Sequence, residues 1–223
     1  QAINYAIDRP KLTKYLRNSI GTPATSGFIP KGMPGFDSTR VKGYNYNPAL
    51  SAKLLEEAGF PGGKGMPEVT LSTSTTYRDL IEFIQGELAN IGIKAKVDVS
   101  PSASLRDMMS KNEVNFFRGS WTADYPDGEN YLSVFYSKNR VPFGPNYTGF
   151  FNDKFDKLFE QSYYEKDAKK RYELYYQMDN MVMEHASVVP ILYDESVVML
   201  QNNISGYMMN PLSLMVLKRV KKD

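Results

Sequence analysis

Three carboxylates and the single tryptophan of the chain lie within residues 119–132, GSWTADYPDGENYL. Pro126 and Gly128 suit a tight turn, and one acidic residue is enough to cap such a turn. The turn itself has no need of Trp121. A carboxylate such as Asp124, beside a large flat wall in a partly dry pocket, instead suits the binding of an ammonium group.

The residues before this stretch place it where ligands commonly bind. Residues 114–121 read as a short strand. In an open α/β sheet, ligands lie outside the carboxyl ends of the strands, on the loops there. Gly119 allows close backbone approach, Trp121 supplies the wall and Asp124 the anionic anchor. We therefore predict that the ligand-binding residues are Gly119, Trp121, Thr122, Ala123, Asp124 and Tyr125.

The acidic residues also have a simpler interpretation. Asp124 and Asp127 can cap turns, or the helix expected near Asn130. We favour that role for Asp127, whereas both interpretations stay open for Asp124. Calcium binding by Asp124, Asp127 and Glu129 is a further alternative, but the spacing misses the EF-hand loop. We expect no cofactor and no metal.

The spacing of apolar residues alternates along the chain between the period of a strand and the period of a helix. Strands are predicted at 68–74, 93–100 and 114–121, and helices at 77–92 and 103–112. This alternation implies right-handed crossovers and parallel strand pairs. The expected fold class is α/β, with a mixed sheet flanked by helices.

Cap residues and apolar periodicity define the remaining elements. Helices are predicted at the very start of the chain, from Asp8 to about Arg17, from Asn47 to Gly59, over 153–165 and over 166–185. Residues 18–47 are irregular but carry apolar residues that need a surface to pack on. A strand or hairpin is expected at 187–200. The tail 212–223 reads as a strand ending in solvated charges, rather than as a basic membrane anchor.

Composition excludes several functions. The 223 residues carry a formal net charge of +2, so no field favours nucleic acid or an anionic membrane. Cysteine is absent, which excludes thiolate metal sites, disulfides and a cysteine nucleophile. A single histidine, His185, cannot build a zinc site, and no G-x-S-x-G motif is present. We expect a binding protein and not an enzyme. A carboxylate-based hydrolase is the weakest alternative.

Five blocks of the chain, in order, resemble one family. They are QAINYAIDRPKL, YNPALSAKLLEEAGF, GSWTADYPDGENYL, NYTGFFNDKFDKLFEQS and ASVVPILYDESVVML. Together they resemble the dipeptide- and oligopeptide-binding proteins of ABC importers, family 5 of the extracytoplasmic solute-binding proteins. The resemblance implies a periplasmic-binding-protein-like lobe of type II, in a two-lobed protein that closes over its ligand.

The resemblance also implies a domain organisation. Residues 1–203 correspond to the second, C-terminal ligand-binding lobe, and 204–223 to a segment that returns to the first lobe. The helical pattern at the first residue, without an initiator methionine, suits a piece of a longer protein. The implied location is extracytoplasmic, either periplasmic or lipid-anchored at the cell surface. The implied partners are a peptide ligand and the membrane permease of an ABC importer, and the implied state is a monomer.

The family also implies a role for Asp124. By matching position it pairs with the α-ammonium group of a peptide, with Trp121 as the neighbouring wall. The sequence departs from the family at 127–130, DGEN, where a second proline is frequent. Some members carry oligosaccharides, and Trp121, Tyr125 and Tyr131 could stack on sugar rings. A receptor lobe that signals without transport stays open as well.

Overall fold

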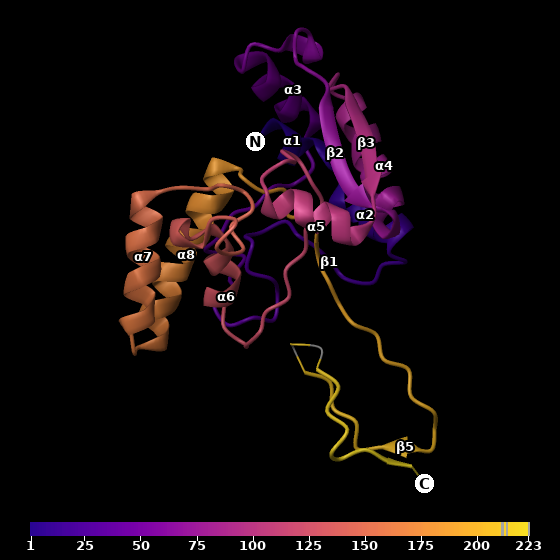
Figure 1. The fold of residues 1–223 in the computed structure, drawn as a ribbon, viewed down its shortest axis with the longest axis vertical. Helices are drawn as coiled ribbons and strands as arrows, with labels where there is room; N and C mark the ends of the chain where they lie inside the picture. Colours follow the sequence, from indigo (N-terminus) through magenta and orange to yellow (C-terminus); the bar gives the residue numbers. More distant parts are fainter. Residues whose placement is uncertain (211, 213, 223) are drawn as a thin grey trace.

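The computed structural model describes residues 1–210, 212 and 214–222. The chain forms two neighbouring regions, from which the C-terminal segment extends away (Figure 1). The α-helices are α1 Ala2–Ala6, α2 Arg9–Leu16, α3 Pro48–Glu57, α4 Arg78–Ala89, α5 Ser102–Ser110, α6 Glu129–Leu132, α7 Asp153–Tyr164 and α8 Ala168–His185. Short 3₁₀ turns span Pro61–Gly63, Thr75–Tyr77, Ser133–Phe135 and Ser137–Asn139. The strands are β1 Thr22–Pro23, β2 Val69–Ser74, β3 Ala95–Ser100, β4 Leu192–Tyr193, β5 Ile204–Ser205 and β6 Lys221–Lys222.

The parallel strand pair predicted from the alternating pattern is confirmed. β2 and β3 run parallel over six residue pairs, from Val69 opposite Ala95 to Ser74 opposite Ser100. Helix α4 makes the crossover between them and packs on both strands. The α/β fold class is therefore confirmed.

Two predicted strands are much shorter than expected. Of residues 114–121, only Phe117 forms a parallel bridge to Ser72. The amide of Arg118 donates to the Ser72 carbonyl at 2.9 Å, and the chain then leaves the sheet. Of residues 187–200, only β4 is a strand, and it pairs antiparallel with β1 instead of forming a hairpin. Apolar runs led to the prediction of a strand in both segments. Strand pairing, however, depends on neighbouring strands that lie far away in sequence.

The predicted helix caps are confirmed. The Asp8 side chain accepts a hydrogen bond from the Lys11 amide at 2.9 Å, and the Asn47 side chain accepts one from the Leu50 amide at 3.0 Å. Each satisfies an amide that a helix start leaves free. Gly59 ends α3 with a φ of 89°, a left-handed conformation that suits glycine.

The two larger hydrophobic cores lie on the two sides of the molecule, and a small third cluster consists of Val41, Tyr44 and Met183. The first joins helices α1 to α4 with the β2–β3 pair, and its buried residues are Ala6, Ile7, Leu12, Leu55, Leu71, Ile81, Ile84, Leu88, Ile91 and Ile93. The second joins α6, α7 and α8 with the segment 28–36, and centres on the rings of Phe135, Phe150, Phe155 and Phe159. The second core carries the candidate site.

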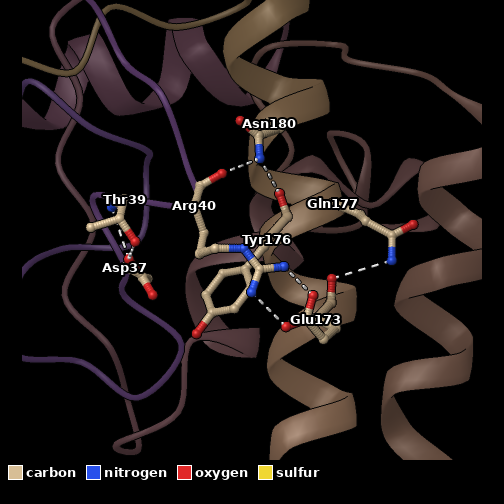
Figure 2. Close-up of polar contacts among 7 residues, drawn as sticks. All are labelled: Asp37, Thr39, Arg40, Glu173, Tyr176, Gln177 and Asn180. Carbon is tan, nitrogen blue, oxygen red and sulfur yellow. Dashed lines mark hydrogen bonds and ion pairs between the residues drawn. The ribbon is translucent and has the colours of Figure 1, made fainter.

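The irregular segment 18–47 packs against α8, as its apolar content predicts. Figure 2 shows the polar edge of this contact, where Arg40 forms a two-pronged ion pair with Glu173. The Arg40 guanidinium also lies 5.0 Å from the centre of the Tyr176 ring. Asn180 donates to the carbonyls of Arg40 at 3.0 Å and Tyr176 at 2.8 Å. The ion pair is exposed, so its role is to fix geometry more than to add stability.

A buried aspartate anchors the same segment from inside. Asp179 of α8 accepts the amides of Phe28 at 2.7 Å and Ile29 at 3.2 Å. Gly27 permits this approach, because a Cβ there would lie 2.0 Å from the Asp179 carboxylate. Burial raises the pKa of Asp179 from 3.8 to about 6, and the two amides oppose the rise only in part.

A buried arginine joins the N-terminal helices to the chain that follows α8. The Arg9 side chain is 1% exposed, and no carboxylate contacts it among the residues that the structure describes. Its Nε donates to the Pro190 carbonyl at 2.6 Å, and its Nη1 and Nη2 to the carbonyl and side chain of Asn4, both at 2.9 Å. A longer contact, 3.4 Å, reaches the carbonyl of Tyr44. Burial lowers the pKa of Arg9 to about 10, so it stays charged at neutral pH.

The C-terminal segment leaves the body after β4. β5 and β6 pair antiparallel through two residue pairs, Ile204 with Lys222 and Ser205 with Lys221. The predicted tail strand is thus shorter than expected, and its residues 213 and 223 fall outside the described residues. Exposed apolar side chains accumulate along the segment, among them Met199, Met208, Leu214, Met215, Val216 and Leu217. Over the described part of the chain, no helix is both long and apolar enough to cross a membrane.

Replacing Arg9 by methionine should destabilise the fold by about 3 kcal/mol or more, because several buried carbonyl acceptors lose their donor. Arg106 is exposed, and its side chain makes neither a hydrogen bond nor an ion pair in the described structure, so Arg106→Met is the matched control. Urea unfolding of both variants measures the difference. Equal midpoints would contradict the role given to Arg9.

Asp179 predicts a pH-dependent stability. Its folded pKa of about 6 lies above the ordinary 3.8, so its contribution is greatest below pH 4 and is lost as pH rises through 6. The difference corresponds to about 3 kcal/mol. Unfolding midpoints measured between pH 4 and 7.5 should show this component in the native protein but not in Asp179→Asn. The same pH dependence in both proteins would refute the assignment.

Candidate functional site

The site loop, residues 119–130, runs from the edge of β2 to the start of α6. It begins directly after Arg118, the last residue bonded to β2, and ends in the second core. The structure therefore places the sequence-predicted residues on the loop that leaves the sheet directly after the segment bridged in parallel to β2.

Asn130 fixes the shape of the site loop. Its side chain is 5% exposed, and its Oδ1 accepts the indole N–H of Trp121 at 2.8 Å and the amide of Asp124 at 3.3 Å. One buried carboxamide thus holds both the aromatic wall and the backbone of the candidate anchor. The two hydrogen bonds join Asn130 to residues six and nine positions earlier, so they fold the loop back on itself.

Asp127 has the capping role that the sequence favours. Its Oδ1 accepts the Glu129 amide at 3.0 Å at the start of α6. The same oxygen accepts the Tyr175 hydroxyl of α8 at 2.7 Å, and Oδ2 pairs with Arg171 at 3.4 Å. Burial and the Asp127 carboxylate raise the pKa of Tyr175, so its hydroxyl stays a donor. Asp127 is therefore committed to internal contacts.

Glu129 is committed as well. Its side chain is 6% exposed, and it accepts the hydroxyl of Tyr125 at Oε2 and that of Tyr163 at Oε1, the latter at 2.9 Å. Burial and the glutamate raise the pKa of Tyr125 to about 12. Both tyrosines therefore remain neutral donors to one carboxylate.

Asp124 is the third carboxylate of the site loop, and it differs from the other two. Its side chain is exposed, and it has neither a hydrogen-bond nor an ion-pair partner among the described residues. Its backbone amide, however, is held by Asn130. The structure thus presents one uncommitted carboxylate at the surface of the loop, on a backbone that Asn130 holds.

The other predicted residues have different surroundings. Gly119 and Thr122 are exposed, Trp121 is half-buried against the second core, and Ala123 is buried in it. A side chain at Gly119 would meet only Phe117, at 3.8 Å, so no internal contact requires a glycine there. The Ala123 methyl faces the core, which leaves only its backbone for a ligand.

Four residues of this region are not among the predicted ligand-binding residues. The sequence places Asn130 at a helix start and offers Glu129 only as a calcium ligand, and Tyr163 of α7 lies 34 residues from Glu129. Arg118 was also missed. Its guanidinium lies 3.3 Å from the centre of the Tyr77 ring, and burial lowers its pKa. An arginine directly before the aromatic and acidic residues of the site loop was the available signal.

The calcium alternative does not fit this arrangement. Within residues 1–210, 212 and 214–222, no group of three or more acidic or histidine side chains is placed to hold a metal ion. Asp127 and Glu129 already accept hydrogen bonds from Tyr175, Tyr125 and Tyr163. Two of the three proposed ligands are therefore occupied.

Replacing Asn130 by alanine should release Trp121 and the Asp124 backbone together. We expect a loss of about 1–3 kcal/mol in stability, because two donors lose their buried acceptor. Trp121 is the single tryptophan of the chain, so its emission should shift to longer wavelength. Asn90 is exposed, and its side chain makes no hydrogen bond in the described structure, so Asn90→Ala is the control. Unchanged emission in Asn130→Ala would argue against this role.

Comparison with known proteins gives a consistent result. The sequence-family model of the bacterial extracellular solute-binding proteins, family 5 Middle, matches residues 1–143. The glutathione-binding proteins GsiB of Shigella flexneri and Escherichia coli K12 are 28% identical over 217 residues, which cover 95% of this chain. The chain spans 42% of the length of these relatives.

Solved structures share the fold. HbpA2 from Haemophilus parasuis superposes with a TM-score of 0.87 at 24% identity, over 100% of this chain and 44% of that one. DppA from Helicobacter pylori, in complex with the peptide STSA, gives 0.85 at 26% identity, over 99% and 43%. A dipeptide-binding protein from Pseudoalteromonas sp. SM9913, in complex with Met-Leu, gives 0.82 at 23% identity, over 100% and 44%.

Proposed function

The chain belongs to family 5 of the bacterial extracellular solute-binding proteins, and from this we propose that the whole protein is the peptide-binding component of an ABC importer. It binds short peptides between two lobes outside the cytoplasm and delivers them to a membrane permease. Several similar proteins carry peptide or glutathione in their names, which supports a peptide as the ligand class.

The observation that carries this proposal is the uncommitted carboxylate of Asp124. A peptide has one feature that a neutral solute lacks, the α-ammonium group at its N-terminus. A fixed carboxylate in a closing cleft suits that group, because the attraction strengthens as water is excluded. Gly119, which no internal contact requires to be glycine, would let the peptide backbone approach the loop.

The proposed domain organisation follows from the same comparison. Residues 1–203 would form the second lobe, and 204–223 would return to a first lobe elsewhere in the whole protein. The chain spans 42% of its curated relatives, which supports a partner lobe. The apolar side chains of the C-terminal segment, such as Met199 at 91% exposure, would be covered by that lobe.

Binding would shift an equilibrium between open and closed lobes, and the permease would recognise the closed form. Main-chain hydrogen bonds would hold the peptide, whereas loosely filled, hydrated pockets would tolerate different side chains. One lobe supplies only part of these contacts. The isolated 223-residue chain should therefore fold but bind peptides weakly or not at all, so binding is best measured on the full-length protein.

An oligosaccharide ligand is the alternative, and the structure offers it less support. Of the three rings proposed to stack on sugars, Trp121 and Tyr131 are half-buried against the second core. Only Tyr125 is exposed, at 44%. A sugar has no cation for Asp124 to bind, so the charge of this residue separates the two ligand classes.

Replacing Asp124 by asparagine should weaken peptide binding by about 100-fold or more, because the ammonium group loses its counter-charge in a desolvated cleft. Calorimetric titration of the full-length protein with Met-Leu, Ser-Thr-Ser-Ala and glutathione measures the change. Asp98 of β3 is also exposed, with no partner for its side chain in the described structure, so Asp98→Asn is the matched control. Peptide affinity that survives Asp124→Asn would refute the anchor, and a sugar ligand should be little affected by it.

A further inference from the structure

Glu129 is a buried carboxylate without a cation. Neither lysine nor arginine contacts it among the residues that the structure describes, and its two oxygens accept phenol hydroxyls only. Burying a carboxylate costs free energy that two neutral donors offset less well than a cation does. Helix α6 begins at this residue, and an apolar side chain there would avoid that cost, so stability does not account for Glu129.

A second tyrosine–glutamate pair shows the more usual arrangement. Tyr136 donates to Glu160 Oε1, and the same oxygen accepts Lys138 Nζ at 2.7 Å. That carboxylate is partly exposed and has a cation. The Glu129 cluster, defined here as Glu129 with Tyr125 and Tyr163, differs in both respects.

The Glu129 cluster connects the site loop to α7. Tyr125 directly follows Asp124 in the loop, whereas Tyr163 lies near the end of α7. Because the Tyr125 hydroxyl is bound to a buried group, the ring is tethered at its far end, yet 44% of the residue stays exposed. The backbone is held too, since the Asp127 amide donates to the Tyr125 carbonyl at 2.8 Å. Tyr125 is therefore a tethered and partly exposed ring, next in sequence to the residue with the uncommitted carboxylate.

We propose that Glu129 is a positioning residue, which holds the Tyr125 ring so that the ammonium group of a bound ligand lies between the Asp124 carboxylate and the ring face. This inference rests on the proposed function. A cation over an aromatic face is attracted by the ring quadrupole, most strongly when it is desolvated. A ring that is already immobilised loses no further rotamer entropy on binding. The uncompensated charge of Glu129 adds to the field that favours a cation.

The test is the preference of the full-length protein for a free amino terminus. Affinity is measured by calorimetry for Met-Leu, Ser-Thr-Ser-Ala and glutathione, and for the N-acetylated form of whichever binds most tightly. The variants are Tyr125→Phe, which keeps the ring but removes the tether, and Glu129→Gln, which removes the charge. Tyr136→Phe, which breaks the second tyrosine–glutamate pair, is the matched control, and Asp124→Asn is the reference for loss of the anchor.

We expect Tyr125→Phe and Glu129→Gln to weaken binding of the free-amine peptide by about three- to tenfold. Binding of the acetylated peptide should change little, so the ratio of the two affinities falls. Tyr136→Phe should leave the ratio at its native value. A merely structural role of Glu129 would lower both affinities together and leave the ratio unchanged.

The outcomes separate this inference from the function on which it rests. If Asp124→Asn abolishes binding but Tyr125→Phe and Glu129→Gln keep the native ratio, the positioning role is wrong and the peptide function stands. If the native protein binds none of the three peptides, both are wrong. Thermal unfolding identifies a variant that fails to fold. If Glu129→Gln does not fold, the affinity ratio of Tyr125→Phe, which removes only one oxygen atom, tests the positioning role.

Discussion

The Arg9 guanidinium is the contact on which the arrangement of the two regions depends. A buried cation without a carboxylate is stable only when carbonyl oxygens surround it, and here they come from residues 4, 7, 44 and 190. These positions belong to the N-terminal helices, to the segment before α3 and to the chain that follows α8. None of the three can move without leaving a donor unpaired. The first core and the helix pair α7–α8 are therefore held in one relative position, and the site loop spans the distance between them.

In the site loop, too, a few buried polar groups hold several segments together. Its acidic side chains differ in their partners more than in their chemistry: Asp127 is bonded to α8 and Glu129 to α7, whereas the Asp124 carboxylate has no hydrogen-bond partner in the described structure. The two committed carboxylates and Asn130 make the loop rigid. A rigid loop can present one free carboxylate at low entropic cost to binding. The proposed ammonium site is thus a property of the whole loop and not of Asp124 alone.

Local sequence signals predicted the local structure well. Asp8 and Asn47 cap helices, Gly59 ends one, and the alternation of periods predicted the parallel pair of β2 and β3. The predictions of long strands at 114–121 and 187–200 were wrong. A strand needs a neighbour with free hydrogen-bonding groups, and an apolar run does not specify that neighbour.

The same limit applies to the site. Residue types and spacing singled out Asp124 and Trp121, and the chain order supported a loop beyond a strand. The capping role of Asp127 was predicted, but the contacts of Glu129 with Tyr163 and of Asp127 with Tyr175 could not be, because these partners lie 34 and 48 residues away. Asn130 lies close in sequence to its partners Trp121 and Asp124. No sequence motif, however, marks an asparagine that accepts hydrogen bonds from an indole and from a backbone amide.

The ligand itself offers the most direct test of a peptide-binding function. Native mass spectrometry of the full-length protein as purified, followed by release and identification of whatever occupies the cleft, makes no assumption about the site. The account predicts a set of short peptides with free amino termini. A sugar, a metal chelate or a reproducibly empty cleft would leave the fold unchanged and would contradict the peptide function.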